Sequence, residues 1–378
     1  MIYLDHAATT PVLPAALEAA WPFLTSDFGN PSSSHELGQR AASALEDART
    51  RVARTLGARA SEVVFTSGGS ESNNTAITGI ALANPRGRHI VSARTEHESV
   101  LESVAFLERV HGFEVSWLPV SRTGEIDLGD VQSALRDDTT LVTLMLANNE
   151  IGAIHPITEI ASLGHAVGAR VHTDAVQAAG WGGISLRELG VDALTLSGHK
   201  FGAPKGVGIL LITNGVACEP LIHGGGQEHE LRSGTENVAW AVAAATALEL
   251  ATSGATAPEL AELLIGGIRR EVPSAVLTGP EHSTATRHAG ICSFIFPGVN
   301  GETLLLELET RGVLVSSGAA CAAGLDEPSH VLLACGFTED EARTAVRFSL
   351  GRGTTRDDIL TSIAATAEAY QTVAQLGR

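Results

Sequence analysis

Short apolar runs alternate with amphipathic helical runs over the first two thirds of the chain. The short runs are typical of buried strands. They span Val63–Thr66, His89–Ser92, Glu114–Leu118, Leu141–Leu146, Arg170–Thr173, Ala193–Leu196 and Gly208–Ile212. Helical patterns lie between them, for example over Ser70–Ala83 and Ile157–Val167. This alternation predicts an α/β fold with a mainly parallel, seven-stranded sheet between helices.

The pattern changes near residues 253–259, where the sequence SGATAPE is small, polar and typical of a hinge or boundary. The remainder mixes helical and strand patterns, which indicates a smaller α+β domain. The expected elements are a helix over Leu260–Glu271, strands near Ala275–Leu277 and Ile291–Phe296, a helix near Glu302–Arg311 and a long final helix from about Arg356. We therefore expect a large domain over residues 14–254 and a small domain formed by residues 1–13 and 255–378.

Composition and charge exclude several kinds of protein. With 378 residues, 44% hydrophobic and 18% charged, the chain can bury a full core and is not typical of disorder. Its formal net charge of −18 argues against a nucleic-acid-binding or anionic-membrane surface. No apolar run reaches the ~18–20 residues of a membrane span, and the start MIYLDHAATTP lacks the features of a signal peptide. We therefore expect a cytoplasmic protein with reduced thiols.

Lysine is almost absent, yet two lysines lie five residues apart. Lys200 and Lys205 are the only lysines, and the other 23 of the 25 basic residues are arginine. Lys200 follows a predicted strand in a glycine-containing stretch, where desolvation can lower the pKa of an amine. Such an amine can form a Schiff base with an aldehyde cofactor. The alternative is a surface lysine on a turn. Lys205, in a P-K-G turn, is expected to anchor a loop.

Two further polar clusters follow predicted strands directly, and in parallel sheets ligands bind at the carboxyl ends of strands. In SGGS (residues 67–70), glycines precede a predicted helix. Backbone N–H groups and the partial positive charge of such a helix N-terminus can form a phosphate cradle. The alternative there is a plain N-cap at Ser67 or Ser70. Asp174 is a carboxylate able to hold a protonated ring nitrogen of a bound cofactor. The alternative is that Asp174 caps the next helix.

The four cysteines differ in their surroundings. No C-x-x-C or other zinc-like spacing occurs, so we expect no metal site. Cys218, Cys292 and Cys335 are expected to be buried small hydrophobes. Cys321 lies in VSSGAACAAGLDEPSH (315–330), which offers no apolar packing face and predicts a mobile loop. A thiol on a mobile loop can enter a site and carry a chemical group out of it.

Taken together, these clusters resemble those of the fold-type I pyridoxal-phosphate enzymes and, more narrowly, of the cysteine desulfurases in the class V aminotransferase group. The matching stretches run in family order over nearly the whole chain: YLDHAATTP (3–11), FGNPSSSH (28–35), TSGGSESNN (66–74), TEHESV (95–100), NNEIG (148–152), HTDAVQ (172–177), SGHK (197–200), HGGGQE (223–228), RSGT (232–235), SSGAAC (316–321) and RFSLGR (347–352). The segment around Cys321 resembles the longer loop form of the first desulfurase group.

The resemblance implies a role for each matching residue. In the large domain, Lys200 would carry pyridoxal 5′-phosphate as a Schiff base and Asp174 would pair with its ring nitrogen. His97 would stack on the ring and act as a catalytic proton carrier. The other expected cofactor contacts are Gly69, Ser70, Asn149, Gln177, Ser197, His199 and, from the second subunit of a homodimer, Thr235. The expected substrate contacts are Asn149, Asn30 and Arg347, whose guanidinium would bind the substrate carboxylate.

The implied activity is a sulfur transfer in which L-cysteine becomes L-alanine and Cys321 becomes a persulfide. The mobile Cys321 loop of the small domain would then pass the sulfur to an acceptor protein, for iron–sulfur cluster assembly or tRNA thiolation. The chain stops at Arg378, without the longer tail with which relatives dock an iron–sulfur scaffold, so a dedicated acceptor is an equal expectation. The alternatives are a selenocysteine lyase or another class V enzyme with an incidental Cys321, and a non-catalytic interaction protein.

Overall fold

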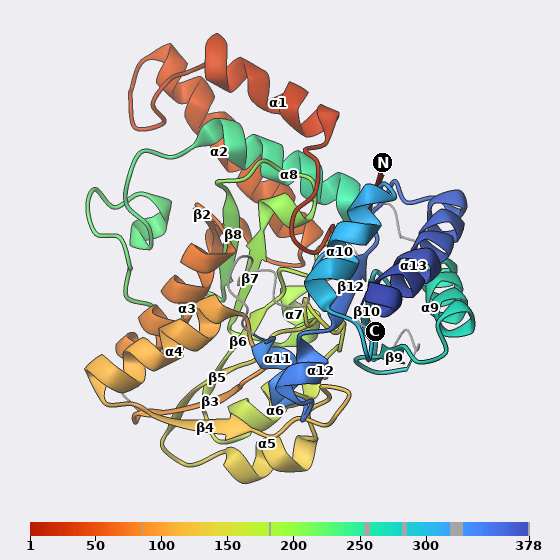
Figure 1. The fold of residues 1–378 in the computed structure, drawn as a ribbon. Coiled ribbons are helices and arrows are strands. Elements are labelled where there is room, and N and C mark those ends of the chain that lie inside the picture. Colours follow the sequence, from red (N-terminus) through yellow and green to blue (C-terminus); the bar gives the residue numbers. More distant parts are fainter. Residues whose placement is uncertain (85, 181–182, 253–257, 282–285, 318–327, 377–378) are drawn as a thin grey trace.

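The centre of the fold is a seven-stranded sheet (Figure 1). The computed structural model describes residues 1–84, 86–180, 183–252, 258–281, 286–317 and 328–376. In spatial order the strands are β2 (Val63–Thr66), β8 (Gly208–Ile212), β7 (Ala193–Ser197), β6 (Arg170–Asp174), β5 (Thr139–Thr143), β3 (His89–Ala93) and β4 (Glu114–Leu118). β8 runs antiparallel to both of its neighbours, and the other adjacent pairs are parallel. The predicted α/β fold with a mainly parallel seven-stranded sheet is confirmed.

One predicted strand is displaced along the chain. The expected run Leu141–Leu146 corresponds to β5, which begins at Thr139 and ends at Thr143. An apolar pattern does not include Thr139, yet this residue is buried because its hydroxyl bonds a buried histidine ring at 2.8 Å. Beyond β5 the chain still follows β6, since Leu146 N donates to Asp174 O at 2.8 Å. The apolar run therefore continues past the strand as a buried extension of it.

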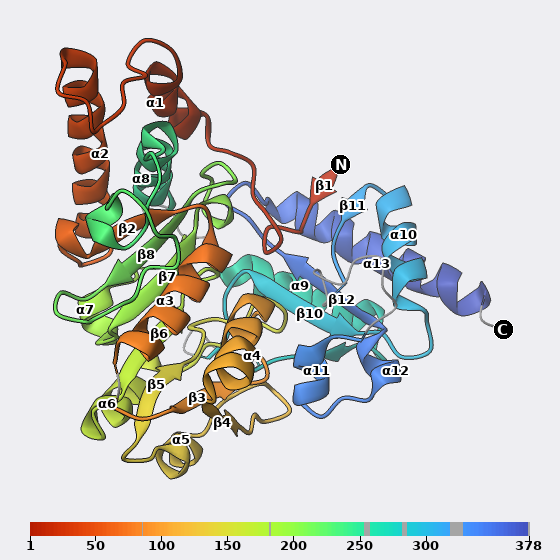
Figure 2. The ribbon, with the colours of Figure 1, turned by 90° about the vertical axis from the view of Figure 1, so that its left-hand side faces the viewer.

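The two faces of the sheet are covered by different helices (Figure 2), because side chains alternate along each strand. Val63 and Phe65 lie in one core, and Val64 lies in the other. The first face packs against α1 (Pro14–Thr25), α2 (Glu36–Thr55), α5 (Leu128–Ala134), α6 (Ile157–Ala166), α7 (Leu186–Leu189) and α8 (Val238–Thr252). The second face packs against α3 (Gly69–Ala83) and α4 (Glu98–His111). Burial of both faces explains why these strands are nearly continuous apolar runs.

A second core lies beside the large sheet and includes residues from both chain ends. Its antiparallel sheet has the order β12 (Ala345–Ser349), β10 (Ile291–Ile295) and β9 (Val276–Leu277). The helices packed there are α9 (Pro258–Glu271), α10 (Gly301–Thr310) and α13 (Arg356–Leu376). β1 (Ile2–Tyr3) joins the same region by pairing in parallel with β11 (Val313–Leu314). β12 was not among the predicted strands, and the domain limits proposed above stay a prediction.

The remaining elements are short. They are α11 (His330–Ala334), α12 (Glu339–Ala342), η1 (Ala60–Glu62), η2 (Gly198–Lys200) and η3 (Glu228–Glu230). The longest helix, α13, buries Ile359, Ile363 and Val373 in the second core but exposes Leu360 and Leu376. Across the described ranges, the helices are too short or too polar to cross a membrane.

Candidate active site

A polar cavity of about 580 Å³ opens at the carboxyl ends of the sheet strands. It receives the ends of β6 and β7 and the loops that follow β2, β3 and β5. Ten of the predicted site residues line this cavity: Gly69, Ser70, His97, Asn149, Asp174, Gln177, Ser197, His199, Lys200 and Arg347. The sheet therefore brings together polar clusters that lie far apart in the sequence, as the rule for parallel sheets predicts.

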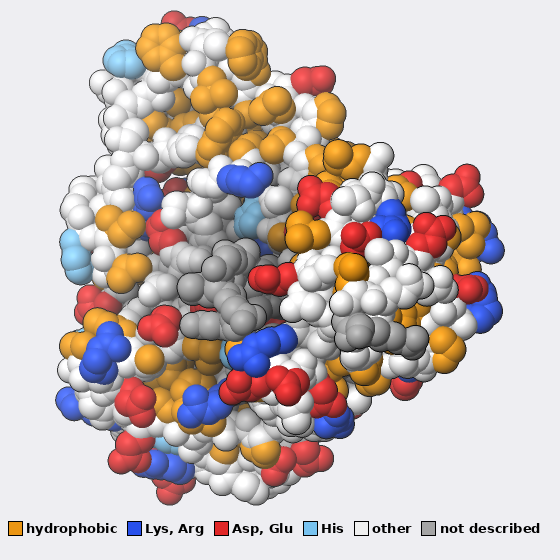
Figure 3. Space-filling view, in the orientation of Figure 1, with side chains coloured by type: hydrophobic (Ala, Val, Ile, Leu, Met, Phe, Trp, Pro, Cys, Tyr) orange, Lys and Arg blue, Asp and Glu red, His pale blue; other side chains and the backbone are white. Residues whose placement is uncertain are grey.

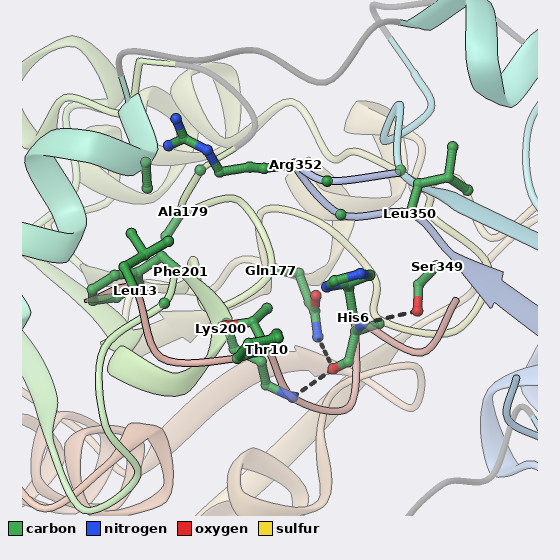
Figure 4. Close-up of a pocket in the computed structure, with 18 of the residues that line it drawn as sticks. His6, Thr10, Leu13, Gln177, Ala179, Lys200, Phe201, Ser349, Leu350 and Arg352 are labelled. Atoms are coloured by element: carbon green, nitrogen blue, oxygen red, sulfur yellow. Dashed lines mark hydrogen bonds between the residues drawn. The ribbon is translucent and has the colours of Figure 1, made fainter. Parts of the chain in front are cut away.

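Lys200 lies in η2, directly after β7, and points toward the N-terminal segment. Its Nζ donates to the backbone oxygens of Ala7 and Ala8 at 2.5 and 2.9 Å. Figure 4 shows Lys200 and Gln177 pointing at one carbonyl of this segment, which is Ala7 O, at 3.0 Å from Gln177 Nε2. The side chain is half-buried in the cavity wall. The alternative of an exposed lysine on a turn is therefore wrong.

A second, more apolar cavity of about 270 Å³ adjoins the first (Figure 4). The two cavities share Ala7, Gln177 and Lys200. The N-terminal segment between them is held in place by Thr10, whose backbone N and Oγ1 both donate to His199 O at 2.8 Å. Lys200 is thus supported by backbone from the far end of the chain.

The N-terminus of α3 forms one end of the polar cavity. Its N-cap residue is Gly68, and no side chain caps it, so the alternative that Ser67 or Ser70 acts as an N-cap is wrong. A Cβ atom added to Gly69 would lie 3.0 Å from Val176 Cγ2 and 3.2 Å from Ser197 Cβ. Glycine is what lets the helix end approach Ser197 so closely. The helix end therefore presents its partial positive charge to an anion in the cavity.

His199 lies at the same end of the cavity as the α3 N-terminus. Burial, and then the charges of Lys200 and Lys205, lower the pKa of His199 to about 4. The imidazole is therefore neutral at neutral pH, and its Nδ1 contacts Thr9 Oγ1 at 3.1 Å. A neutral ring can still donate one hydrogen bond to a phosphate oxygen.

Asp174 ends β6 and is almost completely buried, with 6% of its surface exposed. Its Oδ2 accepts from Asn73 Nδ2 at 2.7 Å, and its Oδ1 accepts from Val176 N at 2.9 Å. The second bond closes a turn, and the next helix begins only at Leu186. The alternative that Asp174 caps a helix is therefore wrong. Two neutral donors leave its negative charge available to a cation in the cavity.

His97 joins the same network through two residues that the sequence analysis missed. Its Nδ1 accepts from Ser99 N at 3.1 Å, and Asn73 Nδ2 donates to Ser99 Oγ at 2.9 Å. Because Nδ1 accepts from a backbone N–H, the neutral ring carries its proton on Nε2. The available signal was spacing: Asn73 lies one helical turn after Gly69, and Ser99 lies in the first turn after His97. The network orients His97 and Asp174 relative to each other.

Arg347 lies in β12 with 1% of its surface exposed and lines the cavity from the second core. Its Nη1 donates to Asn149 O at 3.0 Å, and its Nη2 bonds Asp5 Oδ1 at 2.9 Å. In the described part of the chain, Arg347 Nε has no hydrogen-bond partner. A buried donor without an acceptor costs about 1–3 kcal/mol. The guanidinium is therefore suited to bind an anionic ligand, and Asp5 is a further residue that the sequence analysis missed.

Asn30 and Thr235 lie outside the cavity lining of their own chain. Both are exposed. Thr235 belongs to the long connection between β8 and α8, which extends away from the sheet (Figure 1). This connection is anchored by Glu228, whose carboxylate bonds Arg49 at 2.8 and 3.0 Å and accepts from Phe65 N at 2.8 Å. The predicted roles of Asn30 and Thr235 stay predictions.

The Arg49–Glu228 ion pair holds a strained stretch of backbone in place. Residues Glu228, His229 and Glu230 have φ values of 47°, 57° and 68°, a conformation that costs non-glycine residues roughly 1–2 kcal/mol each. The Arg49 and Glu228 side chains are both buried, with 5% and 3% exposed. A buried ion pair fixes geometry strongly, because losing one partner leaves an uncompensated charge. The connection that carries Thr235 is thus held in one conformation at its base.

Cys321 lies outside the described residues, but both neighbours of that segment are bound near the cavity. On one side, the backbone of Ser316 pairs with Arg347, with N···O distances of 3.2 and 2.7 Å. On the other side, Ser329 Oγ donates to the buried Glu150, and His330 Nε2 donates to Glu96 O at 3.0 Å. Arg347 lines the cavity, so Ser316, the last residue but one of this described range, lies beside the cavity wall.

The three described cysteines are not suited to nucleophilic chemistry. Cys292 and Cys335 are buried, as predicted, and Cys218 is half-buried. Burial raises the pKa of Cys292 to about 11, and raises that of Cys218 and Cys335 to about 12. The reactive form of a thiol is the thiolate, so these three thiols are inert at neutral pH.

Comparison with known proteins identifies the family. The family described as Aminotransferase class-V matches residues 2–361. The cysteine desulfurase IscS of Dictyoglomus turgidum is 44% identical over 364 residues, which cover 95% of this chain and 91% of that protein. The solved structure of a NifS-like protein has a TM-score of 0.90 at 35% identity and covers 98% of this chain and 99% of its own. For a structure described as SspA in complex with cysteine, the TM-score is 0.83 at 36% identity, over 94% of this chain and all of that one. The chain therefore belongs to the class-V aminotransferase family, and within it to the IscS-like cysteine desulfurases.

Proposed function

We propose that this protein uses pyridoxal 5′-phosphate to take sulfur from L-cysteine onto Cys321, leaving L-alanine. The observation that supports this most directly is the shared cavity: an amine, a buried carboxylate and a buried guanidinium all line it, in Lys200, Asp174 and Arg347. The amine can bind the aldehyde of the cofactor and the carboxylate can pair with its ring nitrogen. The guanidinium can bind the carboxylate of an amino-acid substrate. We infer that the protein works as a homodimer.

The cavity fits the cofactor at three points. Lys200 can hold its aldehyde carbon covalently. Asp174 can stabilise a protonated ring nitrogen, because its carboxylate is buried and its other partners are neutral. The phosphate group can lie against the α3 N-terminus, with Gly69, Ser70, Ser197 and His199 around it. When bound, pyridoxal phosphate supplies an electron sink for the carbon atoms of the substrate.

Substrate binding and proton transfer are assigned to side chains of the protein. Arg347 binds the substrate carboxylate through the Nε–H that lacks a protein partner, and Asn149 lies beside it. The freed amine of Lys200 moves the α-proton as base and then as acid. His97, with its proton on Nε2, is placed to pass a proton to or from the thiol groups. Gln177 and the Asn73–Ser99 pair hold these groups in position.

The sulfur step needs a thiolate, and we assign it to Cys321. Its sulfur forms an S–S bond with the substrate sulfur while the C–S bond of the substrate breaks and the carbon takes up a proton. The products are L-alanine and a persulfide, so atoms and electrons balance. Cys321 lies five positions after Ser316, which sets its reach from the cavity edge at up to about 18 Å of extended chain. The three other thiols are protonated at neutral pH and do not compete.

The proposal is tested by loading the protein with pyridoxal phosphate and adding L-cysteine with a thiol reductant. Alanine and sulfide should form in equal amounts. If neither product appears above the level of free cofactor, the proposed function is wrong. The acceptor that takes the sulfur next, in iron–sulfur cluster assembly or tRNA thiolation, can be sought by incubating persulfide-loaded protein with candidate acceptors and measuring sulfur on each. An acceptor sulfurated equally well by Cys321→Ala protein would be excluded.

Replacing Arg347 by glutamine should raise KM for L-cysteine by about 10- to 100-fold, because a charge-assisted bond to the carboxylate is worth about 1.5–3 kcal/mol. Cofactor binding should change little, since the proposed contact of Arg347 is with the substrate carboxylate and not with the cofactor. Steady-state kinetics at saturating cofactor measure this. The matched control is Arg343→Gln, which removes an arginine of the same region outside the cavity lining. An unchanged KM for Arg347→Gln would contradict the carboxylate role.

A mixed dimer should reveal whether Thr235 serves the partner's site. We expect Thr235→Ala to weaken cofactor binding by about 5-fold, the value of one hydrogen bond. Lys200→Ala subunits have no working site but still carry Thr235. Mixing the two variants at limiting cofactor should therefore produce more activity than either variant alone. If mixing adds nothing although mixed dimers form, Thr235 does not act across the interface.

Exposed apolar surface supports the dimer. Leu17, Trp21, Leu24 and Phe28 lie on α1 or just after it, and Trp21 and Phe28 are 63% and 66% exposed. Figure 3 shows hydrophobic side chains gathered over this helix at the top of the molecule. Large exposed aromatic side chains are common at protein interfaces. Asn30 follows Phe28 by two residues, so a partner that covers this surface would also approach Asn30.

A further inference from the structure

The second lysine, Lys205, has no part in the chemistry described above. It lies in the turn between η2 and β8, and glycines with positive φ stand on both sides of it: Gly202 at 90° and Gly206 at 87°. Its side chain is exposed, yet it lines the polar cavity together with Gly206. Because 23 of the 25 basic residues are arginine, the presence of lysine at this exposed position calls for an explanation.

Close backbone packing places the start of β8, three residues after Lys205, against the turn that precedes α3. A Cβ atom added to Gly208 would lie 2.5 Å from both C and O of Gly68. The start of β8 is therefore pressed directly against the turn that precedes α3. Gly198 N also donates to Val207 O at 2.9 Å, which holds the same turn against η2. Lys205 and Gly68 both line the polar cavity, together with Gly69 and Ser70 of the proposed phosphate site.

The helix N-terminus and His199 do not supply enough positive charge to balance a bound phosphate group. A phosphate group carries about −1.5 to −2 charges at neutral pH, whereas a helix N-terminus supplies only about +0.5. His199 is neutral there, with a pKa of about 4. Glu71 also lines this end, but Arg232 Nε pairs with it at 3.0 Å.

The other cations of the lining have different partners. Arg347 pairs with Asp5 at 2.9 Å. Lys200 is the group that binds the aldehyde carbon in the proposed function. Among the described residues that line the cavity, Lys205 is the remaining lysine or arginine. Its charge also reaches the cradle, because Lys205 is one of the causes of the low His199 pKa.

We infer that Lys205 is a cofactor-binding residue whose ammonium group neutralises the phosphate of the bound cofactor. This inference rests on the proposed function and names a residue for its phosphate site. The flexible four-carbon stem lets an exposed ammonium move onto a phosphate as a compact point charge. Arginine would instead present a planar fork of donors, which needs a defined geometry at the phosphate. Both lysines of the chain are then retained for one ligand, one for its aldehyde and one for its phosphate.

The test compares pyridoxal phosphate with pyridoxal, which lacks the phosphate. Equilibrium dialysis at low ionic strength measures the binding of each to wild type, Lys205→Gln, Lys205→Arg and Arg356→Gln. Arg356 is an exposed arginine outside the cavity lining and controls for the change in net charge. Circular dichroism confirms that each variant is folded.

We expect Lys205→Gln to weaken binding of pyridoxal phosphate by about 3- to 10-fold, since an exposed charge contact is worth about 1 kcal/mol. Binding of pyridoxal should not change, Lys205→Arg should recover part of the loss, and high salt should reduce the difference. Equal affinity of wild type and Lys205→Gln for pyridoxal phosphate, or equal weakening for both ligands, would overturn the inference. If wild type itself binds no pyridoxal phosphate, the proposed function fails instead.

Discussion

Lys200→Ala should reduce the rate of alanine formation from L-cysteine by at least about 10³-fold, because one residue loses both the covalent bond to the cofactor and the proton transfer. The fold should persist, since the Nζ contacts of Lys200 are with two backbone oxygens at the cavity wall rather than with the core. Single-turnover formation of alanine, measured at saturating cofactor, gives the size of the loss.

Lys200→Arg is the matched variant for this experiment. Arginine keeps the positive charge and the donors that face Ala7 and Ala8, but it does not lose a proton at usable pH. If the amine chemistry matters, arginine should be as inactive as alanine at this position. Substantial activity in Lys200→Arg would contradict the assignment. So would borohydride reduction of wild-type holoenzyme that attaches the cofactor to Lys205 instead of Lys200.

Cys321→Ala should abolish the release of sulfide and alanine, with a loss of at least about 10³-fold, while the cofactor stays bound. The reason is chemical: the substrate sulfur has no thiolate to attack it once Cys321 is absent. Absorbance of the bound cofactor shows that the site is intact, and the amount of alanine formed gives the loss. Persulfide labelling of wild type, followed by peptide mapping, should place the transferred sulfur on Cys321.

Cys218→Ala is the control, because Cys218 is half-buried and the other two described cysteines are fully buried. Burial raises the pKa of Cys218 to about 12, so its removal should not change the rate. Two results would refute the role of Cys321. One is retained activity in Cys321→Ala, which would favour a class V enzyme with an incidental cysteine. The other is a persulfide found on Cys218.

Much of the large sheet could be predicted from local pattern alone. β2, β4 and β8 have the predicted limits. β2 and β8 are short runs buried throughout, whereas β4 lies at the edge of the sheet and is mostly half-buried. β5 is displaced because Thr139 is buried through a hydrogen bond, which an apolar pattern does not reveal. β12 was missed although it carries Arg347. A buried arginine interrupts the apolar run there, and its burial depends on partners elsewhere in the chain.

Among the cavity residues, too, some could be predicted from the sequence and others could not. Lys200, Asp174 and the glycines before α3 could be identified because each directly follows a strand, and the carboxyl ends of parallel strands share one edge. The supporting residues could not. Asn73 bonds Asp174 across 101 residues, and Asp5 bonds Arg347 across 342 residues. Asn73 and Asp5 lie within the matching stretches 66–74 and 3–11, but the sequence contains no pattern that pairs them with Asp174 and Arg347.

By itself, the sequence determined the fold class, the family motifs and most of the polar residues that line the cavity, because hydrophobic periodicity and strand-end position are local properties. Tertiary structure alone decided how those residues are held. It placed the N-terminal segment against Lys200, left Arg347 Nε without an acceptor among the described residues, and packed Gly208 against Gly68 at a cavity that Lys205 also lines. These arrangements depend on the order of strands in the sheet and on the contact between the two cores, and neither is encoded in the spacing of neighbouring residues.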